Sequence, residues 1–269
     1  MTTDIITKCA FAQCFDLLSA SDISPGWRNT FAKGSRTFCW FKHYPFLWRV
    51  VRFIPYNLLA WLSPEIKLIL DWERGNQKLM REIIDTHDPQ EIPTVNHPTI
   101  FHEILSSDLP SQEKSYEQLW QEGPSLIGAG IETISNTLNV ILFYLLQDAS
   151  QLNRLQKELQ VLMPEPTCLA SWRQLETLPY LTAVISEGLR KAIGVTSRLI
   201  RVAPRYDITY KQYTIPAGYA ISMSIMNLHG NKEVFHNPDI FVPERWLGEN
   251  TKSDLFVFGR GPRMCSGQK

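Results

Sequence analysis

Close to its C-terminal end the chain reads Phe258-Gly259-Arg260-Gly261-Pro262-Arg263-Met264-Cys265-Ser266-Gly267. This F-x-x-G-x-R-x-C-x-G pattern gives one cysteine a chemical context. Gly261 and Gly267 carry no side chain, so the backbone there can approach a flat group closely. Arg263 supplies a planar fork of donors that suits a carboxylate such as a haem propionate. Because backbone N–H groups around Cys265 can bond its sulfur and tune its donor strength, the stretch predicts a thiolate ligand for haem iron.

A glycine-rich surface turn with an idle cysteine is the alternative explanation, and the composition is compatible with both. With 269 residues, 44% of them hydrophobic, the chain can bury a sizeable core as one large or two small domains. The formal net charge is zero, so nothing indicates nucleic acid as a partner. The five cysteines are an odd number without metal-ligand pairing, which favours a reducing compartment: Cys9, Cys14, Cys39, Cys168 and Cys265.

No signal peptide is visible at the N-terminus, and no run of about 18 apolar residues predicts a transmembrane helix. The most apolar stretch, residues 44–70, is rich in aromatic residues but broken by arginines and prolines. It is typical of helices packed in a core or of a face that dips into a membrane interface. The histidines lack the spacing of a metal site, and core or surface roles suffice for them: His43, His87, His97, His102, His229 and His236.

Helical periodicity and capping signals divide the rest of the chain into elements. Helices are expected over 4–20, 64–86, 99–106, 115–146, 148–162 and 181–192, with a polar connector over 88–98. The longest of them is expected to be interrupted at Gly123-Pro124 and at Gly128-Ala129-Gly130. Residues 198–224 alternate like strands, with Ile208–Tyr210 and Tyr213–Ile215 flanking a turn. The fold class predicted is therefore mainly α with a small antiparallel β-sheet.

The longest expected helix contains the run Gly128-Ala129-Gly130-Ile131-Glu132-Thr133-Ile134-Ser135. Its small residues would let a planar ring or dioxygen lie against the helix backbone. The hydroxyl of Thr133 can open the local hydrogen-bond ladder, and the acid of Glu132 beside it can relay protons from solvent. The alternative is a kinked helix with small-residue packing and a solvated glutamate.

A second helix carries Glu187-Gly188-Leu189-Arg190, an E-x-x-R pattern. Positions three apart share one helix face, so Glu187 and Arg190 can pair. On their own such pairs are usually surface ion pairs of little energetic weight. Further along stands the run Phe241-Val242-Pro243-Glu244-Arg245-Trp246.

The four patterns, in the order A-G-x-E-T, E-x-x-R, P-E-R and F-x-x-G-x-R-x-C-x-G, resemble the signatures of the cytochrome P-450 family. The resemblance implies that Cys265 is the axial ligand of the haem iron and that Glu132 and Thr133 deliver protons. It also implies that Glu187, Arg190 and Arg245 form a structural cluster behind the cysteine loop. The sequence departs from the fullest pattern at Ile134, where the family often has a second hydroxyl.

The same resemblance implies cofactor-binding roles for residues of the cysteine loop and of the preceding strand. These are Phe258, Gly261, Arg263, Cys265, Gly267 and Arg201. Arg201 is favoured over Arg198 as a propionate partner because its spacing to Ile215-Pro216-Ala217-Gly218 fits better. The cofactor implied is haem b, with electrons from NADPH through a flavoprotein reductase.

The resemblance makes residues 1–269 a partial cytochrome P-450 domain, truncated at both ends, with specific motifs over 97–269. The family's N-terminal anchor, early helices and final helix are expected to be missing. The implied parts are a helical region over 1–96, a central oxygen-activation helix over 115–146, the E-x-x-R helix over 181–192 and the cysteine ligand loop over 256–267.

Residues Leu178–Ile185 resemble fungal members that oxidise terpenoids and other secondary metabolites. The function implied is a monooxygenase acting on a small hydrophobic substrate, in a family whose members usually sit on the endoplasmic reticulum membrane facing the cytosol. Residues 44–70 are the candidate for peripheral membrane contact. Two alternatives stay open: a truncated, non-catalytic remnant that binds haem weakly or not at all, and a haem-dependent isomerase or dehydratase that keeps Cys265 without needing Thr133.

Overall fold

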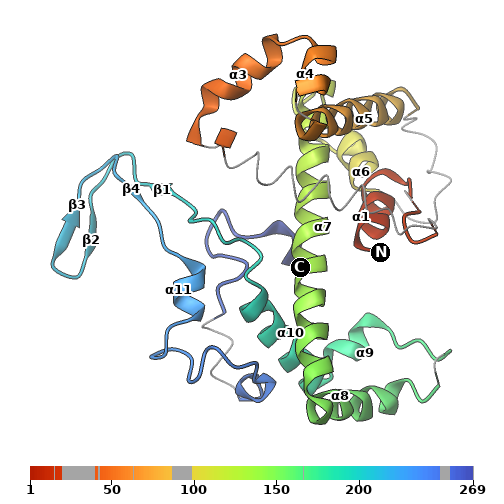
Figure 1. Ribbon diagram of the computed structural model, residues 1–269, viewed down its shortest axis with the longest axis vertical. Helices are drawn as coiled ribbons and strands as arrows, with labels where there is room; N and C mark the ends of the chain where they lie inside the picture. The colour runs from red at the N-terminus through yellow and green to blue at the C-terminus, as the bar shows by residue number, and fades with distance from the viewer. Residues whose placement is uncertain are drawn as a thin grey trace. The chain divides into compact units, whose positions relative to one another are not determined.

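The computed structural model describes residues 1–14, 16–19, 40–41, 43–62, 64–86, 99–165, 167–248 and 255–268. The connector expected over 88–98 lies outside these residues. The chain divides into two compact units, Met1–Ile131 and Glu132–Lys269. The longest helix, α7 (Tyr116–Gln147), runs through the boundary and is drawn in green in Figure 1.

In the first unit the described helices are α1 (Thr2–Phe11), α3 (Pro45–Phe53), α4 (Tyr56–Leu62), α5 (Pro64–Thr86), α6 (Ile100–Ser106) and the start of α7. In the second they are the rest of α7, α8 (Ala149–Leu162), α9 (Trp172–Glu176), α10 (Pro179–Ala192) and α11 (Ile225–His229). The described part of this unit also contains the 3₁₀ turns η1 (Pro243–Trp246) and η3 (Ser266–Gln268). This element content confirms the mainly α fold class.

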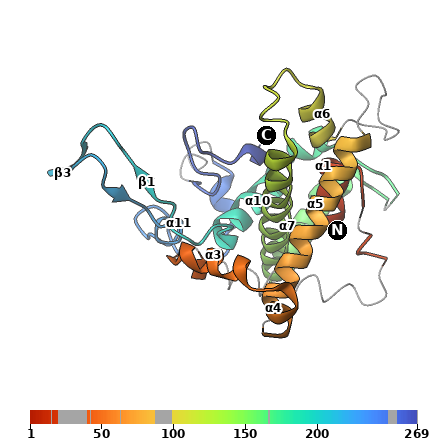
Figure 2. The same ribbon diagram turned by 90° about the horizontal axis from the view of Figure 1, so that it is seen from above.

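Side chains of α1, α5, α6 and the N-terminal half of α7 form the core of the first unit, and Figure 2 shows the ribbons of α1 and α5 beside α7. The rings of Phe11 and Phe101 stack with centroids 4.9 Å apart. These helices turn their apolar faces toward one another. The buried residues of this core are Ala10, Phe11, Leu79, Met80, Ile83, Phe101, Leu119, Ile127 and Ile131. The hydroxyl of Thr99 accepts the His102 N–H and caps α6, as its sequence position predicts.

The first helix is shorter than the 4–20 expected. It ends at Phe11 because Ala12 adopts a left-handed φ of 61° and donates its N–H to the Lys8 carbonyl. The Asp4 carboxylate then accepts the Leu17 N–H at 3.0 Å and turns the chain back onto α1.

The expected interruptions of the central helix are wrong, because α7 is continuous through both glycine-containing sites. Pro124 removes one donor without ending the helix. A side chain on Gly123 would lie 3.5 Å from Met80 and Phe11, and one on Gly130 would lie 2.9 Å from Ile6. Gly123 and Gly130 therefore serve close helix packing rather than helix breaking.

Within the described part of the chain, α7 is also the one helix long and apolar enough to cross a membrane by length and composition. The sequence prediction of no such helix counted consecutive apolar residues. The helix α7 meets the criterion of length and composition although polar and small residues are distributed among its apolar ones, and the absence of a transmembrane helix stays a prediction.

The second unit packs the C-terminal half of α7, α8 and α10 around a second core of Ile141, Leu145, Leu155, Tyr180, Val184 and Phe241. Asp148 caps α8 by accepting the N–H groups of Ser150 and Gln151. The Glu158 carboxylate of α8 accepts the N–H groups of Tyr180 and Leu181 at 2.9 and 2.7 Å, which satisfies donors in the first turn of α10. The Asn136 amide of α7 donates to the Ala192 carbonyl at the other end of α10, 3.0 Å away.

Within the described ranges, the strands form two separate two-stranded antiparallel sheets rather than one. The hairpin of β2 (Ile208–Tyr210) and β3 (Tyr213–Ile215) is as expected, with Lys211 at a positive φ of 52° in its turn. The other sheet pairs β1 (Arg201–Val202) with β4 (Ala220–Ile221), so the stretch of chain between its two strands is longer and contains the hairpin.

Candidate functional site

Glu187 and Arg190 form the most buried charged pair among the described residues. Their side chains are 0% and 2% exposed, and both come from the inner face of α10. The guanidinium binds the carboxylate through two parallel hydrogen bonds: Nε donates to Oε2 at 2.9 Å and Nη2 to Oε1 at 2.7 Å. Such two-point pairing fixes geometry as well as charge.

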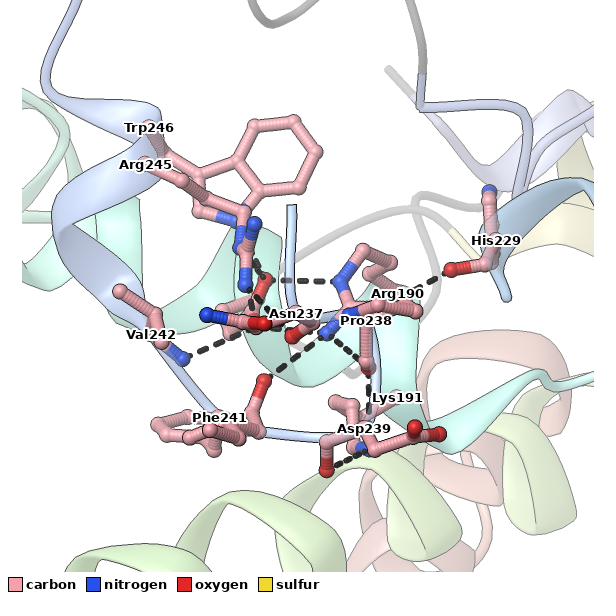
Figure 3. Close-up of polar contacts among 12 residues, drawn as sticks. Arg190, Lys191, His229, Asn237, Pro238, Asp239, Phe241, Val242, Arg245 and Trp246 are labelled. Atoms are coloured by element: carbon pink, nitrogen blue, oxygen red, sulfur yellow. Dashed lines mark hydrogen bonds and ion pairs between the residues drawn. The ribbon is translucent and has the colours of Figure 1, made fainter. Parts of the chain in front are cut away.

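Arg245 of η1 completes the cluster, with Nε 3.2 Å from Oε2 of Glu187. Figure 3 shows the Arg190 and Arg245 side chains pointing toward one another from these two elements. The same carboxylate accepts the Val242 N–H at 2.9 Å and the Trp246 indole N–H at 2.8 Å. The sequence predicted the three charged members, whereas Trp246 and the Val242 backbone were missed as partners.

The two arginines also fasten the segment that runs toward the cysteine loop. Arg190 donates to the carbonyls of His229 and Pro238, both at 2.9 Å. Arg245 donates to the carbonyl of His236 at 2.9 Å. The carbonyls of His229 and Pro238 accept these bonds in buried surroundings, where an acceptor needs a donor, and the three bonds together fix the backbone from α11 to η1.

Burial disfavours the charged form of Glu187. Hydrogen bonds from Arg190, the Val242 N–H and Trp246, together with the charge of Arg190, outweigh this effect and hold the pKa of Glu187 below its ordinary value. The carboxylate is therefore ionised at neutral pH, and its lone pairs are used by donors. Such an occupied carboxylate suits a structural role rather than proton exchange.

In contrast to the buried Glu187–Arg190–Arg245 cluster, the cysteine loop is shaped by its own backbone. Gly259 and Gly261 adopt positive φ angles of 69° and 79°, which a glycine reaches at little cost. The Phe258 carbonyl accepts the Cys265 N–H at 2.8 Å, and the Gly261 carbonyl accepts the Met264 N–H at 3.0 Å. These two N–H groups close the loop on itself and are directed to carbonyls, not to the sulfur as expected.

The Cys265 thiol lies exposed at the end of this loop. A side chain on Gly261 would meet nothing within 4 Å, and one on Gly267 would lie 3.9 Å from Sγ, so the backbone leaves the sulfur accessible. Arg263 is exposed on the same loop, and Phe258 is half-buried beneath it.

The donor set fits haem better than a bare metal ion. Among the described residues, no three His, Cys, Asp or Glu side chains gather to hold an ion. One accessible thiolate is enough for an iron whose other ligands come from a macrocycle. The glycines leave room for a flat ring, and Arg263 offers a cation for its carboxylates.

Glu132 and Thr133 follow each other on α7, with Glu132 exposed and Thr133 half-buried. The Thr133 side chain lies beside Gly194, where an added Cβ would be 3.6 Å from it. The Thr133 carbonyl accepts the Thr137 hydroxyl at 2.8 Å. The expectation that Gly130 leaves room for a ring or dioxygen is wrong at that residue, because Ile6 packs against it.

Arg201 lies on β1 with an exposed side chain, and its Nη1 donates to the Ile200 carbonyl at 3.0 Å. The structure thus brings Glu187, Arg190 and Arg245 into one cluster and Phe258 and Cys265 into one closed loop. Glu132, Thr133 and Arg201 stand on other elements.

Comparison with known proteins leads to the same family as the sequence motifs. A family model described as cytochrome P-450 matches residues 1–269, beyond the part that carries the specific motifs. The cytochrome P-450 monooxygenase MO6277 of Ascocoryne sarcoides is 38% identical, over 99% of this chain and 54% of that protein. The cytochrome P-450 monooxygenase sdnE of Sordaria araneosa is 37% identical, over 98% of this chain and 54% of that protein.

The chain thus spans about half the length of the curated relatives it matches. A crystal structure of a cytochrome P-450 superposes with a TM-score of 0.69 at 19% identity, covering 99% of this chain and 56% of that one. At this identity the superposition shows the fold.

Proposed function

The chain belongs to the cytochrome P-450 family, and we propose on that premise that it is part of a haem-thiolate monooxygenase. The reaction would insert one oxygen atom from dioxygen into a hydrophobic organic substrate and reduce the other to water, with two electrons from the reductase and two protons. The observation that carries this proposal is the exposed thiol of Cys265 on a closed, glycine-rich loop. The relatives named as cytochrome P-450 monooxygenases support it.

Haem b is the cofactor proposed, with Cys265 Sγ as the axial ligand of its iron. Phe258, Gly261 and Gly267 would shape the backbone against the ring, while Arg263 and Arg201 would pair with its propionates. When bound, haem supplies the electron-transfer and oxygen chemistry of the reaction. The protein supplies the thiolate, the charge partners and the orientation.

Glu132 and Thr133 are the proposed proton-delivery pair. Successive helix residues differ in direction by about 100° because a turn holds 3.6 residues. An exposed Glu132 can therefore take a proton from solvent, while the half-buried Thr133 hydroxyl holds one on the inner side. The Thr133 methyl group faces the Gly194 position, where an added Cβ would lie 3.6 Å away.

Electrons would come from NADPH through a flavoprotein reductase, since the sequence has no G-x-G-x-x-G run after a strand. The substrate class proposed is a secondary metabolite such as a terpenoid. Its support is the Leu178–Ile185 segment together with the fungal source of the relatives.

Residues 44–70 are proposed to touch a membrane surface, with the family's usual place on the cytosolic face of the endoplasmic reticulum. No side chain of α3 is buried. Phe53 and Trp61 are 86% and 78% exposed, and Arg52 stands beside Trp48. Exposed aromatic residues with flanking arginines suit the boundary between lipid headgroups and acyl chains.

A carbon monoxide difference spectrum of the chain, expressed with haem supply and then reduced, tests the proposal. A red-shifted, thiolate-type Soret band that disappears in Cys265→Ser is expected. The alternative of a non-catalytic remnant predicts a blue-shifted band or none.

Replacing Thr133 by Ala separates the two catalytic alternatives. Loss of turnover with an unchanged thiolate band supports oxygen activation. Intact turnover would favour an isomerase or dehydratase, because these reactions need the thiolate without the proton-delivery hydroxyl.

A further inference from the structure

His229, the last residue of α11, is buried, although none of the sequence motifs includes it. Its side chain is enclosed, with 1% of the residue exposed, and its ring meets the Phe235 ring edge-on at 5.9 Å. Its carbonyl accepts Arg190 Nη1, and Figure 3 shows that carbonyl facing the arginine. His229 is therefore attached through its backbone to the Glu187–Arg190–Arg245 cluster.

The imidazole reaches in the other direction, to the cysteine loop. Its Nε2 accepts the Phe256 N–H at 3.3 Å. An accepting Nε2 places the proton of the neutral ring on Nδ1, a buried atom that finds no acceptor among the described residues. The contact with Phe256 therefore selects the tautomer in which Nε2 is free to accept.

Two backbone hydrogen bonds lie between Phe256 and Cys265, the residue that carries the thiol. The Phe256 carbonyl accepts the Gly259 N–H at 3.0 Å, and the Phe258 carbonyl accepts the Cys265 N–H at 2.8 Å. The Arg260 guanidinium covers the Phe256 ring at 4.1 Å. His229 thus joins the buried cluster at one end to the loop of the candidate ligand at the other.

We infer that His229 is a positioning residue: its neutral imidazole holds the cysteine loop in place for ligation by Cys265 and releases the loop on protonation. The inference rests on the proposed haem-thiolate function and adds a pH dependence to it. His229 acts through the Phe256 backbone and touches neither Cys265 nor the proposed cofactor.

Protonation breaks the contact for a geometric reason. A protonated Nε2 carries its own hydrogen and would confront the Phe256 N–H, donor against donor. Among the described residues, the charged groups that act on the ring are both on α10: Arg190 repels an imidazolium, while Glu187, which attracts it, is already paired with two arginines. Leu255, Phe256 and Val257 of the loop have no ionisable side chain.

The direction of the pH effect follows. Burial and then the charge of Arg190 lower the pKa of His229 from its ordinary value. The ring is therefore neutral in the folded chain above about pH 6.5, the ordinary histidine pKa, and the contact with Phe256 is fully present there. The contact is lost as the pH falls below that value through the lowered pKa.

The test compares the haem-loaded wild type with His229→Gln and His229→Leu by carbon monoxide difference spectra between pH 7.5 and 5. The glutamine amide can accept the Phe256 N–H but does not titrate, whereas leucine keeps bulk and loses the acceptor. The wild type is expected to lose thiolate band as the pH falls below about 6.5, and His229→Gln to keep it. A His229→Gln variant that followed the wild-type profile would overturn the inference.

A second measurement needs no haem and so separates failure of this inference from failure of the proposed function. Hydrogen exchange of residues 255–268 at pH 7.5, read by mass spectrometry, should be about five- to tenfold faster in His229→Leu than in wild type. His229→Gln should resemble wild type, and the α8 peptide serves as the internal control for global unfolding. Equal exchange of the loop in wild type and His229→Leu would contradict the positioning role, whatever the spectra show.

Discussion

The Glu187 cluster and the cysteine loop differ in almost every physical respect, although the segment between them is short. The Glu187 carboxylate is fully enclosed and accepts hydrogen bonds from Arg190, Arg245, Val242 and Trp246. The Cys265 thiol is exposed, and its loop is closed by backbone bonds of its own. One region is held by side chains that need each other, and the other by backbone turns.

The contrast indicates which of these two regions contributes to stability and which to chemistry. A buried charge network is tolerated when it is nearly complete, so the removal of one member leaves an uncompensated charge. An exposed thiol contributes little to the stability of the folded state and can itself act as a ligand instead. We therefore expect substitutions in the cluster to change stability first, and substitutions in the loop to change cofactor binding first.

The largest effect is expected for Glu187→Gln. The variant leaves Arg190 and Arg245 without their carboxylate, and a broken buried pair typically costs about 3–5 kcal/mol of unfolding free energy. Urea unfolding followed by circular dichroism measures the loss. The matched control is Glu244→Gln, which breaks the half-exposed pair with Arg154 and should cost about 1 kcal/mol or less. Equal losses in the two variants would remove the distinction between buried and exposed pairs.

Acid should erase most of that difference. The pKa of Glu187 is lower in the folded chain than its ordinary value of about 4.3. Its contribution to stability is therefore present above that pH and is lost as the pH falls through the lowered pKa. Unfolding free energies at pH 7, 5, 4 and 3 should show wild type and Glu187→Gln converging below about pH 4. A constant gap down to pH 3 would mean that the carboxylate charge is not what stabilises the cluster.

A smaller loss is expected for Gly188→Ala, in the E-x-x-R segment itself. A methyl group there would overlap the Ile141 side chain of α7, and overpacking typically costs about 1–3 kcal/mol. The loop counterpart is Gly267→Ala, whose methyl would make an ordinary 3.9 Å contact with the Cys265 sulfur. Thermal unfolding should separate the two variants, since Gly267→Ala should change stability by about 0.5 kcal/mol or less.

The sequence was most informative where structure depends on near neighbours. Thr99 and Asp148 were readable as the starts of α6 and α8 because a cap bonds within a few residues. The spacing of Glu187 and Arg190 placed both on one helix face, which the structure confirms as a direct pair. Arg245 could be added through family resemblance, since no local rule connects η1 with α10.

The sequence failed where a distant residue decides the environment. Gly130 indicated an open helix face, but Ile6 of α1 fills it. His229 gave no motif, and its contact with Phe256 spans 27 positions. The early end of α1 depends on the left-handed Ala12, a residue type that rarely adopts this conformation. These features follow from tertiary packing, which periodicity and capping rules do not contain.

The smallest change in stability, and the sharpest change in chemistry, is expected for Cys265→Ser. Serine replaces an exposed thiol whose backbone N–H bond to Phe258 does not depend on the side chain. The unfolding free energy of the haem-free chain should therefore change by about 0.5 kcal/mol or less. A hydroxyl is a hard, protonated donor at neutral pH, so the thiolate-type band should vanish completely. Chemical unfolding of the haem-free variant and the carbon monoxide spectrum of the reduced, haem-loaded one measure the two quantities separately. A large loss of stability would show that the loop takes part in holding the fold, and the contrast with the Glu187 cluster would then have to be abandoned.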